Sequence, residues 1–262
     1  MHTPQPIGEQ LREWRQRRRL SQLDLALDVE ISTRHLSFVE TGRAQPSRDM
    51  VLRLAAELDV PLRERNAMLL AAGYAPIFAD RPLDDAGLSQ ARAAIETLLA
   101  AHDPFPALAV DRHWNLVTAN EGGARLMRGV AAHLLEPPVN VLRLSLHPEG
   151  AAPRIANLAE WKAHLLHRLR KQFEASADPA LLDLLEELRG YPAPPPATPN
   201  AGALAVPLVL NSPRGTMSFL STTMLFGSPL DVTLSELAIE FFLPADAATI
   251  ERLRAASVSA AR

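Results

Sequence analysis

The chain has 262 residues, of which 47% are hydrophobic and 22% are charged, so it can form one large domain or two modest ones and can bury a core. Because it contains no cysteine, the sequence excludes disulfide scaffolds, thiolate nucleophiles, iron–sulfur clusters and cysteine-bound zinc. The net charge of −3 is unevenly spread, because residues 1–56 hold nine arginines against seven acidic residues. Only this first part of the chain suits a polyanionic partner.

The sequence carries no sign of a membrane protein. No apolar run approaches the roughly 18 to 20 residues that span a bilayer. The first six residues lack the basic and apolar regions of a signal peptide. We therefore expect a cytoplasmic protein with no membrane partner.

The first part of the chain is predicted to be all helical. From Ile7 to about Ala72 the apolar residues recur at helical spacing in short bursts separated by turn signals. We expect about five helices, over residues 7–19, 22–29, 33–40, 48–58 and 61–73, with Ser21, Ser32 and Ser47 as N-caps. In the second helix, Leu23, Ala26 and Leu27 are the expected buried stripe. The division we predict is a helical domain over 1–74, a linker over 75–87 and a second domain over 88–262.

The second domain is predicted to be α+β. Helices are expected over residues 88–101, after Asn120, and over 157–174, 180–189 and 246–256. Strands are expected over residues 107–111, 115–119, 204–210, 216–226 and 237–243, the third and fourth joined by a hairpin turn at 211–215. Five prolines within residues 191–199 indicate a spacer. These elements predict a small antiparallel sheet with helices packed on one face.

One motif in the first domain points to DNA. The residues Ser21-Gln22-x-x-Leu25-Ala26-x-x-Val29-x-Ile31-Ser32-x-x-x-Leu36-x-x-Val39-Glu40-x-Gly42-Arg43, followed by Pro46-Ser47, resemble the Cro/repressor-type helix-turn-helix of the XRE family. Apolar residues of the motif clamp two helices across a tight turn at Glu30-Ile31. The outer face of the third helix is then free to enter a major groove, unless the motif serves a protein contact instead.

The resemblance implies a role for individual residues. Thr33, Arg34 and Phe38 would face base edges, and phosphates would be contacted by Gln22, Ser32, His35 and Arg43. Arg34 suits guanine and Phe38 suits a thymine methyl group; the alternatives are a solvated arginine and a phenylalanine packed on the adjoining helix. Because one domain is only weakly basic, we expect a homodimer on an inverted repeat of double-stranded DNA, with recognition helices about 34 Å apart.

The second domain has a resemblance of its own. Residues 106–120 read as strand, turn, strand and then Asn120 at a helix start, which resembles the opening of a PAS domain. The later motifs look like the MmyB-like ligand-binding domain found behind this helix-turn-helix in bacterial regulators; they are Arg154-x-x-Asn157-x-x-x-Trp161, Phe219-x-Ser221-Thr222-x-x-x-Phe226-Gly227-x-Pro229-x-Asp231-Val232-Thr233-Leu234, Glu240 and Pro244-Ala245-Asp246. The resemblance implies a PAS-like sheet around an apolar pocket and a small apolar ligand, such as a fatty-acid-like acyl chain.

The candidate pocket residues combine large apolar groups with a few hydroxyls, as a ligand site requires; they are Trp114, Trp161, Leu165, Met217, Phe219, Ser221, Thr223 and Phe226. The alternative is a solid core, in which case the second domain is a dimerisation or protein-interaction module without ligand. A cavity on the order of several hundred cubic ångströms would distinguish the two.

Evidence for an enzyme is weak. Glu160, His164 and His167 project from one side of one predicted helix and have the chemistry to ligate zinc or iron, but Arg168 crowds them and no partner helix supplies further ligands. Phosphate loops, nucleophile elbows and dinucleotide fingerprints are absent from the sequence. We expect no enzyme and no metal, but a DNA-binding transcription regulator whose affinity for DNA responds to a ligand. If it activates transcription, it would also contact RNA polymerase.

Overall fold

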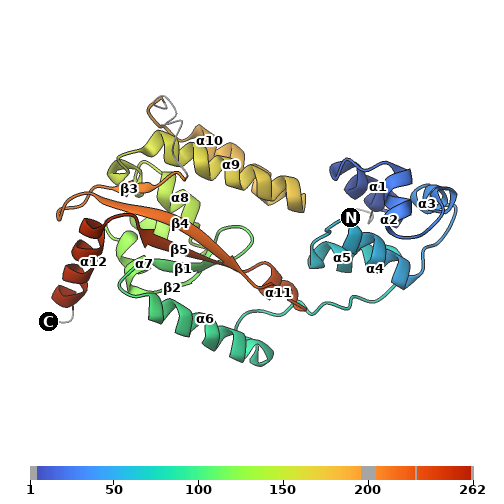
Figure 1. Ribbon diagram of the computed structural model, residues 1–262, viewed down its shortest axis with the longest axis horizontal. Helices are drawn as coiled ribbons and strands as arrows, with labels where there is room; N and C mark the ends of the chain where they lie inside the picture. The colour runs from blue at the N-terminus through green and yellow to red at the C-terminus, as the bar shows by residue number, and fades with distance from the viewer. Residues whose placement is uncertain (1–4, 196–204, 228, 261–262) are drawn as a thin grey trace. The chain divides into compact units, whose positions relative to one another are not determined.

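The computed structural model describes residues 5–195, 205–227 and 229–260 (Figure 1). These form two compact units, the first from residues 5–82 with 229–235 and the second from residues 83–227 with 236–260. Two expected features lie partly outside the described residues, namely the end of the proline spacer from residue 196 onward and the beginning of the strand expected from Leu204. Within the described part of the chain, no helix combines the length and apolar composition that crossing a bilayer requires.

The first unit is the helical bundle that the sequence predicts. Its helices are α1 (Ile7–Arg17), α2 (Gln22–Asp28), α3 (Thr33–Glu40), α4 (Arg48–Glu57) and α5 (Leu62–Ala71). Each end lies within two residues of its expected position. Ser21, Ser32 and Ser47 cap α2, α3 and α4 by accepting backbone N–H bonds at the third residue beyond each serine.

The buried stripe expected on α2 is wrong in two positions. Leu23 is 55% exposed and Leu27 is 66% exposed, whereas Leu25 and Ala26 are fully buried. A helix turns by about 100° per residue, so Leu23 and Leu27 both lie about 200° around the helix from Leu25. The seven-residue helix therefore points Leu25 and Val29 at the core and turns the other two leucines outward.

Helix α1 packs very closely against the end of α3. A Cβ atom placed on Gly8 would lie 2.4 Å from the carbonyl oxygen of Val39 and 2.8 Å from that of Glu40. Both neighbours are backbone atoms, which cannot rotate away as a side chain can. Glycine at this position therefore lets the two helices approach and brings Glu40 close to α1.

A short segment distant in sequence completes the first unit. Residues 229–235, which the sequence division assigns to the second domain, contain the short helix α11 (Val232–Ser235), and this helix packs on α5. The backbone N–H of Val232 donates to the carbonyl oxygen of Ala79 at 2.7 Å, and the Val232 side chain is completely buried. The Thr233 hydroxyl donates to the carbonyl oxygen of Arg81.

The second unit is built on a five-stranded antiparallel sheet. Its strands are β1 (Ala107–Val110), β2 (Leu116–Ala119), β3 (Leu208–Leu210), β4 (Met217–Leu225) and β5 (Ala238–Pro244), in the order β2-β1-β5-β4-β3. The expected pairing of β3 with β4 is present, with Val209 opposite Ser218. Strand β5 lies in the centre, where Glu240 is opposite Leu108 of β1 and Thr223 of β4.

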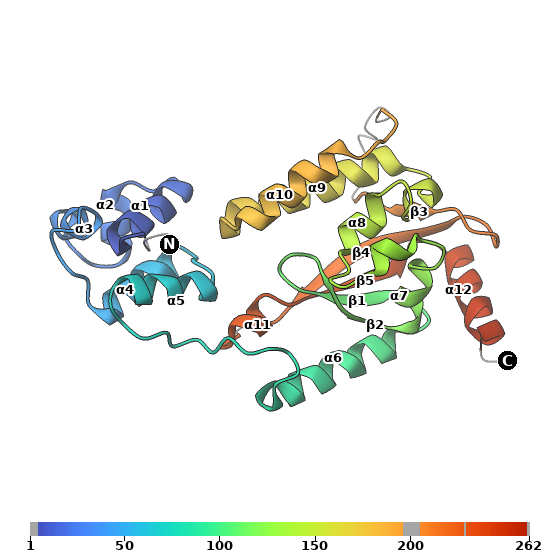
Figure 2. The ribbon, with the colours of Figure 1, turned by 180° about the vertical axis from the view of Figure 1, so that it is seen from behind.

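Helices cover both faces of this sheet, which corrects the expectation of one covered face (Figures 1 and 2). One face carries α6 (Ser89–His102), whose Ile95 and Leu99 pack against Ala107, Ala109 and Ile239. The opposite face carries α8 (Val141–Leu146), α9 (Leu158–Ser176) and α10 (Pro179–Gly190). Strand β1 is apolar on both sides, so each face needs a cover.

The remaining elements connect these layers. They are α7 (Glu121–Leu126), α12 (Ala247–Ala260) and the short 3₁₀ helices Ala86–Leu88, Ala132–Leu135 and Ala152–Arg154. Asn120 caps α7 as expected, since its side-chain oxygen accepts the N–H of Gly123. The same oxygen accepts the N–H of Ala107, so this buried asparagine also fixes α7 to β1.

Candidate functional site

A buried ion pair holds α3 in place within the first unit. The Arg15 guanidinium donates to the two carboxylate oxygens of Glu40 at 2.6 and 2.8 Å, and the amide of Gln22 donates to the same carboxylate at 2.8 Å. Burial alone would raise the pKa of Glu40, but these hydrogen bonds and the charges of Arg15 and Arg12 hold that pKa below its ordinary value. Glu40 thereby joins the ends of α1, α2 and α3.

The outer face of α3 presents two arginines around one aromatic ring. The guanidinium carbon of Arg34 lies 5.3 Å from the ring centroid of Phe38, one helical turn further on. That of Arg43, which follows Gly42, lies 6.0 Å from the same centroid. Both distances suit cation–π attraction, and both arginines are exposed while Phe38 is half-buried. The arrangement offers two positive charges and an apolar ring on one surface.

The other candidate DNA-contacting residues are placed differently. Ser32 is exposed at the start of α3, where its hydroxyl accepts the His35 backbone N–H at 3.1 Å, and Thr33 follows it. The Gln22 side chain is used within the unit, on Glu40. The His35 ring is half-buried, with Nε2 3.3 Å from the sulfur of Met50. The structure therefore gathers Ser32, Thr33, Arg34, Phe38 and Arg43 at α3, and directs the Gln22 side chain inward.

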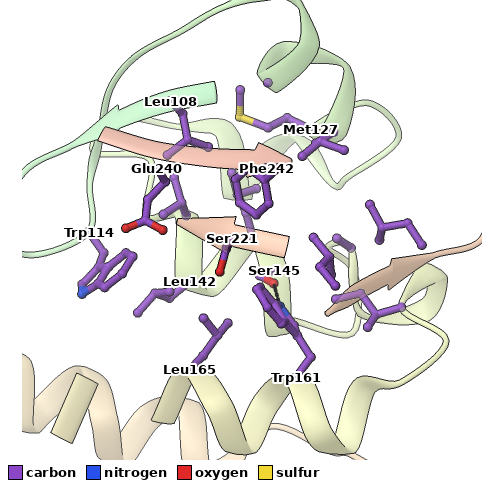
Figure 3. Close-up of a pocket in the computed structure, with 18 of the residues that line it drawn as sticks. Leu108, Trp114, Met127, Leu142, Ser145, Trp161, Leu165, Ser221, Glu240 and Phe242 are labelled. Atoms are coloured by element: carbon purple, nitrogen blue, oxygen red, sulfur yellow. Dashed lines mark hydrogen bonds between the residues drawn. The ribbon is translucent and has the colours of Figure 1, made fainter. Parts of the chain in front are cut away.

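The second unit contains a partly open cavity between the sheet and helices α8 and α9 (Figure 3). Its walls are mostly apolar and include Leu108, Leu142, Trp161, Leu165 and Phe242. The cavity volume is about 90 Å³. At about 10–15 Å³ per water-sized group, this is room for about six to nine such groups. The cavity is therefore smaller than ordinary ligand sites, which begin at about 300 Å³, and suits only a compact ligand.

One end of the cavity is polar. The Arg168 guanidinium donates to both carboxylate oxygens of Glu240, at 2.8 and 3.1 Å, and Glu240 is only 3% exposed. The Thr223 hydroxyl donates to Glu240 at 2.7 Å and accepts from Arg168 at 2.8 Å. The Arg168 guanidinium lies 4.9 Å from the ring of Trp114, whose Nε1 donates to Gln172 at 2.7 Å.

Hydroxyl groups provide further polarity in the cavity wall. Figure 3 shows the oxygen of Ser221 directed into the cavity from β4. The Ser145 hydroxyl accepts the Nε1–H of Trp161 at 3.0 Å and so fixes the indole that forms one wall. These groups can orient a ligand that is otherwise apolar.

Half of the candidate pocket residues line the cavity, namely Trp114, Trp161, Leu165 and Ser221. Phe219 is fully buried and Met217 is half-buried, and both belong to the packed core rather than to the cavity lining. Thr223 sits beside the lining and acts through Glu240 and Arg168. Phe226 packs against the opposite face, in the cluster beneath α6.

Three residues that line the cavity were not expected there from the sequence, namely Arg168, Glu240 and Phe242. Alternation along β5 contains a usable signal, because Glu240 is a lone acidic residue between Ile239 and Phe241 in an otherwise apolar strand. Pairing with β4 then places Phe242 opposite Ser221 and Glu240 opposite Thr223, on one face.

Possible metal ligands are arranged differently from the sequence hypothesis. His164 stacks on Trp161 with ring centroids 5.4 Å apart, and burial, aided by the charge of Arg168, lowers its pKa. Among the described residues, the potential metal-binding group is instead His133, His147 and Glu149, whose ligand atoms lie within 4.8 Å of one another. His133 and Glu149 are exposed, and the Glu149 backbone N–H donates to Nδ1 of His147.

Two protein-family models match this chain, one in its first part and one in its second. Residues 6–68 match the family model of a helix-turn-helix domain. Residues 91–256 match that of the MmyB-like transcription regulator ligand binding domain. A search of curated proteins finds no match to this chain. Since the second match covers more than half of the residues, the chain belongs to the MmyB-like transcription regulators, in which a DNA-binding helix-turn-helix precedes a ligand-binding domain.

Proposed function

We propose that the protein is a one-component regulator, which binds an operator through α3 and changes its DNA affinity when a small apolar ligand occupies the cavity of the second unit. The observation that carries the proposal is the partly open, mostly apolar cavity in a chain that also presents Arg34, Phe38 and Arg43 on the surface at α3. The target is chromosomal DNA, so we place the protein in the cytoplasm of a bacterial cell.

Arg34 is the proposed base-reading residue. Its guanidinium is exposed, positioned by Phe38, and able to donate two hydrogen bonds to a guanine edge, while Phe38 meets a thymine methyl group. In this proposal Thr33 also faces base edges, and Ser32, His35 and Arg43 contact phosphates. The same role for Gln22 requires its side chain to leave the carboxylate of Glu40. These roles are the ones that the resemblance to the helix-turn-helix family implies.

The experiment on DNA binding begins with an operator selected from a pool of random duplexes. Arg34→Ala should cost about 1–3 kcal/mol of specific binding and relax the base preference at one position. Arg170→Ala is the matched control, because it removes the same charge from an exposed position of α9 in the second unit. Equal losses for Arg34→Ala on operator and on random DNA would contradict base reading.

We propose that the active form is a homodimer. The weakly basic balance of the first unit limits one copy to few phosphate contacts, and two copies on one DNA face combine their affinities. The selected operator should then be an inverted repeat with half-site centres about 34 Å apart, or one helical turn. A selected site without internal symmetry would argue against the dimer. Contact with RNA polymerase would be added if the protein activates transcription.

The ligand effect needs a route from the cavity to the first unit. Strands β4 and β5 supply Ser221, Glu240 and Phe242 to the cavity, and the chain between these strands includes residues 229–235 of the first unit. Val232 anchors that segment through its buried side chain and its bond to Ala79. Val232→Ala should therefore preserve ligand binding and DNA binding measured separately, while weakening the effect of one on the other. If the ligand changes the DNA affinity of Val232→Ala as much as that of the wild type, this route is excluded.

The presence of a ligand can be tested on the purified protein. Native mass spectrometry should show a small apolar adduct that disappears on denaturation. Ser221→Phe should remove the adduct by filling the cavity, whereas Thr222→Phe should keep it, because Thr222 is exposed on the opposite face of β4. If no adduct appears, and added acyl compounds do not bind, the second unit is an interaction module without ligand.

A further inference from the structure

The polar end of the cavity carries one charge of each sign. Of the described residues that line the cavity, Arg168 and Glu240 are the charged ones, and they are hydrogen-bonded to each other at 2.8 and 3.1 Å. Thr223 bonds to both. The guanidinium also lies over the Trp114 ring. The positive charge is thus neutralised within the protein before any ligand enters.

The polar groups next to Arg168 and Glu240 do not alter the balance between these two charges. Burial, aided by the charge of Arg168, lowers the pKa of His164, which disfavours a further positive charge at this end. The remaining polar groups of the wall, Ser221 and Ser145, are uncharged hydroxyls. The Ser145 hydroxyl accepts the indole N–H of Trp161, and the Ser221 hydroxyl is directed into the cavity.

This balance discriminates between ligand head groups. A carboxylate placed at the polar end would meet the buried carboxylate of Glu240 at short range, where like charges repel. An amide, ester or alcohol brings no charge, and its oxygen can bond to the Ser221 hydroxyl. The Ser221 hydroxyl is directed into the cavity and can donate to such an oxygen.

We propose that the cavity selects an uncharged ligand, a short apolar chain ending in an amide, ester or alcohol group, and rejects the corresponding carboxylate. The inference rests on the proposed ligand-binding function of the second unit. It adds the head-group chemistry, which the apolar walls alone do not determine.

Hexanamide and hexanoate are the probes, because they share the same shape and number of non-hydrogen atoms and differ in charge at pH 7.5. Both fit the room for about six to nine groups. Binding is followed in the full-length chain through the indole N–H signals in nitrogen-15 correlation spectra. Trp114 and Trp161 line the cavity, whereas Trp14 lies in α1 of the first unit and serves as the internal control.

For the wild type we expect hexanamide to shift the Trp114 and Trp161 signals and to bind at least about tenfold more tightly than hexanoate, a difference of about 1.4 kcal/mol. Glu240→Gln keeps the side-chain shape and a hydrogen-bond acceptor for Thr223, but frees the charge of Arg168. In this variant hexanoate should gain at least about tenfold, while hexanamide changes by less than about threefold. Adding Arg168→Met to Glu240→Gln should remove the gain.

Three results would overturn the inference. Wild-type binding of hexanoate as tight as that of hexanamide refutes it while leaving the ligand site intact. A folded Glu240→Gln variant without improved hexanoate binding refutes the role of this charge pair. If neither probe nor longer homologues move the two cavity indoles, the ligand function itself fails. The wild-type comparison decides the matter even if Glu240→Gln does not fold.

Discussion

Replacing Glu40 with glutamine should destabilise the first unit strongly. The Glu40 side chain is fully buried, and the side chain of its partner Arg15 is only 11% exposed. Removing one member of a buried pair costs about 3–5 kcal/mol, because the other charge remains buried without compensation. Glutamine keeps the shape and one accepting oxygen, so we expect a loss near the lower limit, about 3 kcal/mol.

Urea unfolding followed by the indole signals measures this loss in the intact chain. With a denaturant slope of about 1–3 kcal/mol per molar urea, the midpoint of the Trp14 transition should fall by about 1–3 M. The Trp114 and Trp161 transitions report the second unit and should remain in place. Glu57→Gln, at an exposed position of α4, is the control and should change stability by less than about 0.5 kcal/mol.

The pH dependence tests the electrostatic cause. Because the folded-state pKa of Glu40 lies below its ordinary value of about 4.3, its stabilisation is complete above that value and is lost as the pH falls through the folded-state pKa. The stability difference between wild type and Glu40→Gln should therefore be constant near pH 7 and shrink below about pH 4.3. A loss below about 1 kcal/mol, or a difference independent of pH, would refute the reasoning.

Two further predictions concern packing and ionisation. Gly8→Ala should lower the stability measured by the Trp14 transition by about 1–3 kcal/mol, because the new Cβ would meet backbone oxygens. The control is Gly190→Ala, whose new Cβ meets no atom within 4 Å and which should be neutral or slightly stabilising. Equal effects of the two substitutions would contradict the close packing of α1 on α3. Burial and its hydrogen bond to Glu187 raise the pKa of Tyr191 to about 12, so the second unit should lose stability between about pH 10 and 12 as this phenol ionises. The loss should be absent in Tyr191→Phe, and an absorbance titration that shows both tyrosines ionising near 10 would contradict it.

The helical unit was predictable because its signals are local. Serine caps, turn residues and apolar spacing all act within a few residues, and they locate α1 to α5 closely. The orientation of α2 was not predictable in the same way, because Leu23 and Leu27 repeat at the same helical spacing as Leu25 and Val29. Which pair is buried depends on where α3 and α4 lie, and that is not a local property.

The second unit shows where pattern recognition fails. Leu142, Leu144 and Leu146 alternate as in a strand, yet they are buried in the one-and-a-half turns of α8, which Asn140 initiates by accepting two backbone N–H bonds. A helix this short is set by its cap and its surroundings rather than by periodicity. Likewise, the cavity depends on how far α8 and α9 stand from the sheet, so sequence alone could name Trp114, Trp161, Leu165 and Ser221 but not separate them from core residues such as Phe219.

The size of the cavity limits how the proposed regulation by a ligand can operate. A ligand shifts an equilibrium only by its difference in affinity for the two states, and a shift from 1:99 to 99:1 requires about 5.5 kcal/mol. A ligand of about six to nine non-hydrogen atoms, the number that fits this volume, gains at most about 9–14 kcal/mol at the ceiling of about 1.5 kcal/mol per atom. A complete switch would therefore use about two fifths or more of the total, so the ligand must bind one state almost exclusively. Strands β4 and β5 can provide that discrimination if the arrangement of residues 229–235 on α5 occurs in one state and is lost in the other.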